Sequence, residues 1–131
     1  RETRHIVGKY VMTGLDVVAG RDFADSIACG GHPVDVHPLP PEVEHMPMNH
    51  WRFHIPYRIL VPETVENLLV AGRCVSATRM ASGSLRTTVQ CMATGEAAGL
   101  AAAMSAAAGI SPAAIDVAAL QERLKRAGAI L

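Results

Sequence analysis

The feature that most constrains this chain is a short apolar segment followed by a long alanine-rich one. Asn67-Leu-Leu-Val-Ala-Gly is apolar after its first residue and ends in glycine, which is typical of a strand buried on both faces of a parallel sheet. The segment from Ser84 to Ala108 is rich in alanine with few helix breakers, and Gly109 follows as a C-cap. The order of these segments predicts a buried strand, an irregular turn and a long buried helix.

The turn between these two segments has the composition of a ligand-binding corner. Ala71 and Gly72 end the predicted strand with tiny side chains or none, so that a ligand can approach the backbone at the carboxyl end of a parallel sheet. Gly83 and Ser84 lead into the predicted helix, where free amides and the helix dipole favour negative charge. The amides concerned belong to Leu85, Arg86 and Thr87. We therefore expect a negatively charged ligand at this corner.

Small residues recur along the predicted helix at spacings of three and four and form one stripe: Gly95, Ala98, Gly99, Ala102 and Ala106. Such a stripe lets a helix lie close to a sheet or to another helix. On its own, a stripe of this kind reflects the helix propensity of alanine more often than a nucleotide-binding fold. Because the strand and the glycine turn precede it here, we expect the helix to pack closely on a sheet.

Composition excludes several classes of protein. A chain of 131 residues, half of them hydrophobic and 18% charged, is long enough for one packed core. The formal net charge is zero and the basic residues are scattered, so we expect no nucleic-acid partner. Arg73 and Glu96 interrupt the most apolar segments before these reach the roughly 18 residues of a membrane span. We therefore expect no membrane partner either.

The cysteines bear on the compartment. Cys29, Cys74 and Cys91 are an odd set without a C-x-x-C pair, so they suggest neither a disulfide framework nor a structural zinc site. This pattern favours a reducing compartment, and we predict a cytoplasmic protein. The chain opens without methionine and without a basic-then-apolar leader, so we expect a fragment or a processed product.

Composition also divides the chain into three predicted regions. Residues 1–57 hold all six histidines and most of the prolines, and we expect a β-rich and loop-rich region. Within them His5–Met12 and Phe53–Tyr57 have strand-like composition, and a helix is expected near Leu15–Ile27, capped by Asp16. Residues 58–109 hold the strand and the long helix. Residues 110–131 start at Ser111-Pro112 and have apolar positions that predict an amphipathic C-terminal helix: Ile115, Leu120, Leu124 and Ala127.

Several motifs together resemble a known family. Four segments follow one another in this order: Ile55-Pro-Tyr-Arg-Ile-Leu-Val-Pro, Val65-Glu-Asn-Leu-Leu-Val-Ala-Gly-Arg-Cys-Val-Ser-Ala-Thr, Gly83-Ser-Leu-Arg and Cys91-Met-Ala-Thr-Gly-Glu-Ala-Ala-Gly-Leu-Ala-Ala-Ala. Together they resemble the C-terminal part of the FAD-dependent oxidoreductases, a family of the glutathione-reductase-like flavoprotein clan. The opening Arg1-Glu-Thr-Arg-His-Ile-Val-Gly-Lys-Tyr and the later Pro33-Val-Asp-Val-His resemble earlier motifs of that family. The likeness thus covers nearly the whole chain.

The resemblance implies an α/β fold (α+β as a fragment), namely the end of a Rossmann-like FAD-binding domain plus part of a β-rich substrate domain. It implies FAD as the cofactor, with Gly72 and Arg73 beside the pyrophosphate and ribityl chain. The residues that it places facing the flavin ring are Gly83, Ser84, Leu85 and Arg86. The family's G-x-G-x-x-G motif has no counterpart here, so we expect the chain to cover roughly the last third of the family architecture, with residues 1–57 in the substrate domain and 58–109 in the FAD-binding domain. We expect the full-length parent to be the enzyme, and this chain alone to be inactive and not to bind FAD independently.

Three residues are candidates for catalysis. Asp35 and His37 are two positions apart in an extended segment, so their side chains are expected on one side, where the carboxylate can orient the histidine for proton transfer. Arg58 follows Pro56-Tyr at the junction of two regions and is a candidate for binding an anionic substrate group or the cofactor, with a structural ion pair as the equal alternative.

The sequence therefore predicts a fragment of an FAD-dependent oxidoreductase that acts on a small-molecule substrate and associates with the rest of its parent chain, with a homo-oligomer left open. Two alternatives stay open. One is a non-catalytic scaffold or interaction module, because the glycine fingerprint is missing. The other is a metal-dependent hydrolase built on His32, Asp35 and His37, although such spacing alone is a weak metal signal and we predict no metal ligand.

Overall fold

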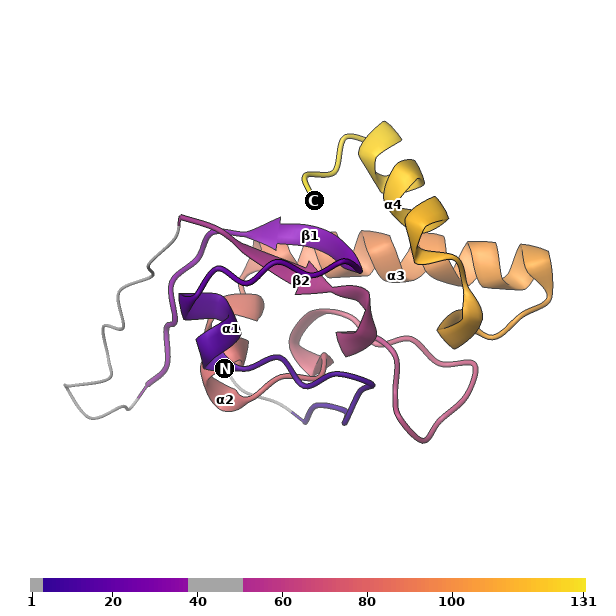
Figure 1. Cartoon of the computed structure of the whole chain (residues 1–131). Helices are drawn as coiled ribbons and strands as arrows, with labels where there is room; N and C mark the ends of the chain where they lie inside the picture. The colour runs from indigo at the N-terminus through magenta and orange to yellow at the C-terminus, as the bar shows by residue number, and fades with distance from the viewer. Residues whose placement is uncertain (1–3, 38–50) are drawn as a thin grey trace.

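A computed structural model describes residues 4–37 and 51–131. Figure 1 shows its four α-helices and two β-strands, with the long helix α3 behind the strands and α4 across it. Their bounds, in chain order, are α1 Gly14–Val18, β1 Ser26–Gly30, β2 Phe53–Pro56, α2 Arg79–Leu85, α3 Thr88–Ala108 and α4 Val117–Arg126. Three short 3-10 turns are η1 Tyr57–Ile59, η2 Gly72–Cys74 and η3 Pro112–Ala114. The mixture of α and β structure agrees with the predicted fold class.

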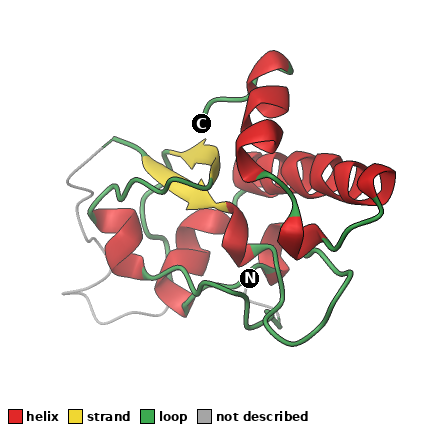
Figure 2. Ribbon diagram, turned by 45° about the vertical axis from the view of Figure 1, so that its right-hand side comes forward, coloured by secondary structure: helices red, strands yellow, loops and turns green. Residues whose placement is uncertain are grey.

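The sheet consists of β1 and β2, which pair antiparallel (Figure 2). The register joins Ser26 to Pro56, Ala28 to Ile55, Cys29 to His54 and Gly30 to Phe53, with an irregularity between Ser26 and Ala28. The strand-like segment at Phe53 is thus confirmed. The segment His5–Met12 forms isolated bridges instead, from Gly8 to Pro62 and from Met12 to Ala77.

The predicted buried strand Asn67–Gly72 is wrong for this structure. Asn67 has a left-handed φ of 54°, Leu68 is 43% exposed, and within residues 4–37 and 51–131 no strand pairs with the segment. The Val70 amide does donate to the Leu60 carbonyl at 2.9 Å. A central parallel strand is stable only between neighbouring strands that bond its backbone, and the described part of the chain supplies none.

The long helix is confirmed, but it begins later than predicted. Thr87 has an extended backbone (φ −70°, ψ 155°), which separates α2 from α3. Gly109 caps α3 in the left-handed conformation (φ 65°, ψ 30°), as predicted. Gly83, Ser84 and Leu85 therefore lie in the last turn of α2, not at the start of the long helix.

The small-residue stripe of α3 faces away from the sheet, contrary to the prediction. The buried face of α3 is formed by Gln90, Thr94, Ala97, Ala101 and Ser105. Among the described residues, nothing lies within 4 Å of a Cβ placed on Gly95 or Gly99. The described residues thus leave one face of α3 exposed over most of its length.

The two remaining helices differ from prediction in their caps and bounds. Thr13, not Asp16, is the N-cap of α1, and Asp16 is its capping-box partner. The helix ends at Val18 because Gly20 takes a positive φ of 61° before β1 begins. The C-terminal segment divides into η3 and α4, where Leu120 and Leu124 are buried as predicted and Ala127 is exposed. No helix in the described ranges is long and apolar enough to cross a membrane.

Candidate functional site

The structure brings together three side chains from two distant segments. Asp35 Oδ1 lies 2.7 Å from His37 Nε2, and Asp35 Oδ2 lies 2.6 Å from an Arg86 guanidinium nitrogen. The same Arg86 nitrogen also donates to the Asp35 carbonyl oxygen at 3.1 Å. We call these residues the Arg86–Asp35–His37 set. The predicted proximity of Asp35 and His37 is confirmed, whereas their role in catalysis stays a prediction.

Alternation along an extended segment places two of these side chains on the surface. Val34 and Val36 are buried in the core, at 5% and 6% exposure. The intervening Asp35 and His37 side chains are 38% and 48% exposed. Successive side chains of an extended chain point to opposite sides, so the valines anchor the segment while the acid and the histidine face outward together.

Helix α2 holds this segment at three points. Arg79, its first residue, donates from a guanidinium nitrogen to the His37 carbonyl oxygen at 3.1 Å. Arg86, its C-cap, bonds Asp35 as described above. Between them Gly83 lies so close that a Cβ there would be 2.7 Å from the Asp35 carbonyl oxygen. The glycine that the sequence suggested for a ligand thus lets α2 approach the segment that carries Asp35.

The arrangement has the geometry of an oriented base. A neutral His37 whose Nε2–H donates to Asp35 has its lone pair on Nδ1, the nitrogen that accepts a proton. The carboxylate fixes the ring and stabilises the imidazolium that forms after proton uptake. The Arg86 charge neutralises the second carboxylate oxygen. Such a set can remove a proton from a substrate group placed beside His37.

Metal binding at this segment finds no support in the structure. His32 Nδ1 lies 2.8 Å from the Pro33 carbonyl oxygen, and its side chain is not part of the set. Within the part of the chain that the structure describes, no group of three or more histidine, cysteine or acidic residues is placed to hold a metal ion. The described residues therefore give no metal-binding group for the alternative built on His32, Asp35 and His37, which stays a prediction.

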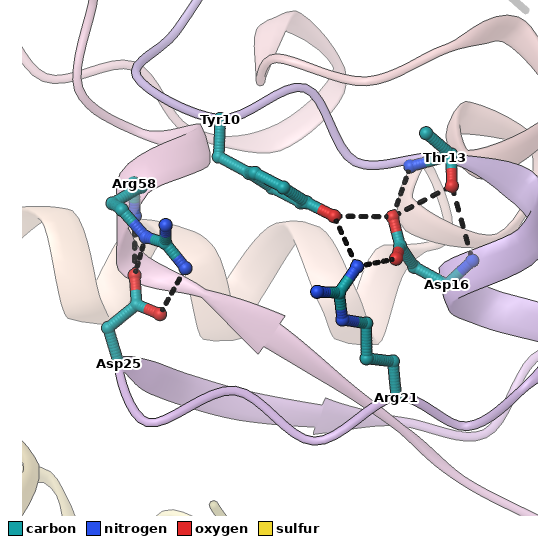
Figure 3. Close-up of polar contacts among 6 residues, drawn as sticks. All are labelled: Tyr10, Thr13, Asp16, Arg21, Asp25 and Arg58. Atoms are coloured by element: carbon teal, nitrogen blue, oxygen red, sulfur yellow. Dashed lines mark hydrogen bonds and ion pairs between the residues drawn. The ribbon is translucent and has the colours of Figure 1, made fainter.

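Arg58, the third candidate for catalysis, is engaged in an ion pair. Its guanidinium forms two hydrogen bonds with Asp25, at 2.8 and 3.1 Å, and lies 5.2 Å from the centre of the Tyr10 ring (Figure 3). The hydrogen bond to Asp25 raises the pKa of Arg58, so the side chain stays charged. This contact matches the structural alternative considered for Arg58, and a role in substrate binding stays a prediction.

A polar network beside Arg58 was not foreseen from the sequence. The buried carboxylate of Asp16 accepts hydrogen bonds from the Tyr10 hydroxyl and from the Thr13 amide and hydroxyl, and it pairs with Arg21 at 2.9 Å (Figure 3). Burial alone would raise the pKa of Asp16, but the bonds from Thr13, Arg21 and Tyr10 outweigh burial and hold the pKa below its ordinary value of 3.8. The signal in the sequence was the Thr13-Gly-Leu-Asp capping box.

The other predicted cofactor residues lie at the turn η2, which packs on α3. Gly72 has a positive φ of 67°, and its amide donates to Thr94 Oγ1 at 3.0 Å. A Cβ on Gly72 would lie 3.7 Å from Cys91 Sγ. Burial raises the pKa of the Cys91 thiol, and the nearby charge of Arg73 opposes that rise. The turn therefore places the exposed Arg73 close to the first turns of α3.

Comparison with known proteins identifies the family. The sequence model of the family described as FAD dependent oxidoreductase matches residues 1–124. This chain belongs to the FAD dependent oxidoreductase family. No curated protein and no solved structure matches the chain.

The predicted flavin-facing residues of this family member fit an FAD only in part. Gly83, Ser84 and Leu85 are buried within α2, so their backbone is not presented to a ligand by this chain. The Ser84 hydroxyl is a buried polar atom without a hydrogen-bond partner among the described residues, two positions before Arg86.

The start of α3 fits an anionic group better. Thr87, its N-cap, makes no side-chain hydrogen bond to the helix amides that the structure describes, and no acidic residue lies in the first turn. Val89 in that turn is 69% exposed. Free first-turn amides of a long helix attract negative charge, and Arg73 adds a cation nearby. The start of the long helix, which the sequence placed at Leu85–Thr87, thus lies at Thr88, and anion binding there stays a prediction.

Proposed function

We propose that this chain supplies part of the active site of an FAD-dependent oxidoreductase, with its own residues on both the cofactor side and the substrate side. The observation that carries the proposal is the Arg86–Asp35–His37 set, in a chain whose family uses FAD. FAD would accept the hydride from the substrate when bound. The protein's contribution is to orient the reactants and to move the accompanying proton.

On the substrate side, His37 would accept a proton through Nδ1 while Nε2–H remains bonded to Asp35. The reacting group of the substrate would have to lie within hydrogen-bond reach of that nitrogen. The proton would leave a substrate heteroatom, and the freed electron pair would form a double bond to the neighbouring carbon as the hydride leaves that carbon, so the histidine favours oxidation without itself changing redox state. We therefore propose His37 as the base and Asp35 as the residue that orients it.

On the cofactor side, the amides at the start of α3 would hold negative charge, and Arg73 with the turn at Gly72 would lie along the phosphate-bearing part of the cofactor. This proposal is supported by the contact of η2 with α3 and by the exposure of Arg73. The Gly72 amide is already bonded to Thr94, so Arg73 and the helix amides, rather than that amide, would carry the interaction.

The exposed face of α3 supports association with the rest of a flavoprotein. Glu96 is the one charged residue between Thr88 and Ala108. A long helix with so few charged residues is ordinarily buried on most of its surface, yet the described residues cover one face of α3. We propose that further protein of the same oxidoreductase covers the open face, which carries Val89, Met92, Gly95 and Gly99.

Flavin binding is the first test. The full-length oxidoreductase that contains this chain should show the absorbance bands of oxidised flavin, either as purified or after incubation with FAD and removal of the excess, and this chain by itself should not retain flavin. Arg73→Gln should weaken the retention of FAD, because a charged contact to a phosphate is lost. A full-length protein that stays colourless after incubation with FAD would refute the proposal.

The role of His37 is tested separately in the FAD-loaded protein. His37→Gln should slow the reduction of bound flavin by about 10²–10⁴-fold, which is the usual contribution of a general base. The reductant in this assay is any substrate that reduces the flavin of the unsubstituted protein. His32→Gln is the matched control, because His32 lies in the same segment outside the set. Equal rates of flavin reduction in His37→Gln and the parent protein would remove His37 from the mechanism.

A further inference from the structure

The contacts of Arg86 are with another side chain of this protein, whereas the resemblance placed Arg86 facing the flavin ring. It is the C-cap of α2, its side chain is 19% exposed, and its guanidinium is directed at Asp35. We propose that Arg86 is a positioning residue that acts on His37 through Asp35. The proposal rests on the proposed function in one respect, since it takes His37 as the base.

The contacts of Arg86 fix Asp35 at two atoms. One guanidinium nitrogen bonds the carbonyl oxygen at 3.1 Å and carboxylate Oδ2 at 2.6 Å. The backbone and the carboxylate of Asp35 are therefore held by a single planar group. With Oδ2 occupied, Oδ1 remains for His37 Nε2, at 2.7 Å. The bond from Arg86 fixes the rotation of the carboxylate, so that Oδ1 faces the histidine.

The backbone under His37 is fixed independently of Arg86. Val34 and Val36 anchor the segment in the core, and Arg79 bonds the His37 carbonyl oxygen at 3.1 Å. These backbone contacts do not fix the orientation of the imidazole ring, which is 48% exposed. Asp35 bonds the ring at Nε2, and Arg86 in turn bonds Asp35. Loss of Arg86 should therefore mobilise the ring while the segment stays folded.

The experiment measures the mobility of the His37 ring by NMR relaxation of ¹³C-labelled histidine in the full chain. In the unsubstituted protein the ring should be ordered, with an order parameter of about 0.8. In Arg86→Gln the order parameter should fall below about 0.6. Asp35→Asn tests the same path, and Arg86→Gln combined with Asp35→Asn should be no more mobile than either single variant. Arg86→Lys keeps the charge and should restore part of the order.

Two controls separate positioning from general loosening. Arg58→Gln removes another paired arginine, that of Asp25, and should leave the His37 ring ordered. The His32 ring should not respond to Arg86→Gln, because its recorded contact is with Pro33. An amide spectrum that matches the parent outside the set shows that each variant is folded. A His37 ring as ordered in Arg86→Gln as in the parent protein would overturn the proposal.

A second readout distinguishes positioning from cofactor contact. The FAD-loaded Arg86→Gln protein should retain as much flavin as the parent protein. Loss of flavin from this variant, with the His37 ring still ordered, would assign Arg86 to the cofactor and overturn the proposal. Neither measurement uses turnover, so unchanged flavin reduction in His37→Gln would refute the proposed function without deciding whether Arg86 orders the ring.

Discussion

The same substitution in two helices should have opposite effects on the stability of this protein. Gly83→Ala and Gly99→Ala both replace a helical glycine, and alanine favours a helix over glycine by about 1 kcal/mol at each site. The surroundings of the two sites differ. A Cβ at Gly83 would lie 2.7 Å from the Asp35 carbonyl oxygen and 2.7 Å from Val36 Cγ2, whereas a Cβ at Gly99 would have nothing within 4 Å among the described residues.

The magnitudes decide the sign at each site. At Gly99 the helix propensity acts alone, so the free energy of unfolding should rise by up to about 1 kcal/mol. At Gly83 the new methyl group meets a backbone carbonyl that cannot rotate away, and overpacking of this kind costs about 1–3 kcal/mol. The two variants should therefore differ by about 1–3 kcal/mol, with Gly83→Ala the less stable.

Urea unfolding of the full chain, followed by circular dichroism, measures this difference. The denaturant dependence should be unchanged, so that a shift in the midpoint reports stability. Because Gly83 lies against Asp35, Gly83→Ala should also raise the mobility of the His37 ring, and Gly99→Ala should not. Equal midpoints for the two variants would refute the conclusion that Gly83 exists to let α2 approach Asp35.

Two other predictions concern ionisable groups. Asp16→Ala should lower the free energy of unfolding by about 1–3 kcal/mol near neutral pH, because the partners of the carboxylate lose a buried acceptor. The lowered pKa of Asp16 means that the ionised carboxylate stabilises the fold above pH 3.8, and that this stabilisation is lost as the pH falls below 3.8. The unfolding curves of the unsubstituted protein and of Asp16→Ala should therefore converge in acid. A difference in stability that persists in acid would contradict this role of Asp16. Burial raises the pKa of Tyr57 to about 12, so the stability it contributes is complete below 10.0 and is lost as the pH rises toward 12. Tyr57→Phe, which removes the bond to the Pro112 carbonyl oxygen, should cost about 1 kcal/mol and abolish that alkaline loss, as measured by urea unfolding at several pH values.

Local patterns predicted the helices better than the strand, for a physical reason. The alanine-rich composition and Gly109 determine most of α3 through contacts within one helix. The segment Asn67–Gly72 has the composition of a buried strand, but a strand needs neighbours, and none lies beside it within the described residues. The break at Thr87 was missed because no glycine or proline marks it.

The candidate site was likewise predictable from the sequence where it depends on local pattern and not where it depends on tertiary contacts. Asp35 and His37 could be paired from sequence, because a period of two in an extended segment places them on one side and the flanking valines identify the buried side. Arg86 could not be joined to them, since it lies 51 residues away and its neighbours in sequence suggested a helix start that binds an anion. An arginine at the end of a short helix reaches whichever carboxylate the tertiary fold brings beside it.

The position of Arg86 also bears on how the two sides of the proposed active site are connected. It lies between α2, which contacts the Asp35–His37 segment, and Thr87, the N-cap of α3. A shift at the start of α3, such as an anion bound to its first amides would produce, would act directly on the backbone that precedes it. Because Arg86 bonds both the carbonyl and the carboxylate of Asp35, such a shift would reach His37 through two contacts. Addition of FAD to the protein should therefore change the NMR signal of the His37 ring, and Arg86→Gln should remove that response while FAD remains bound.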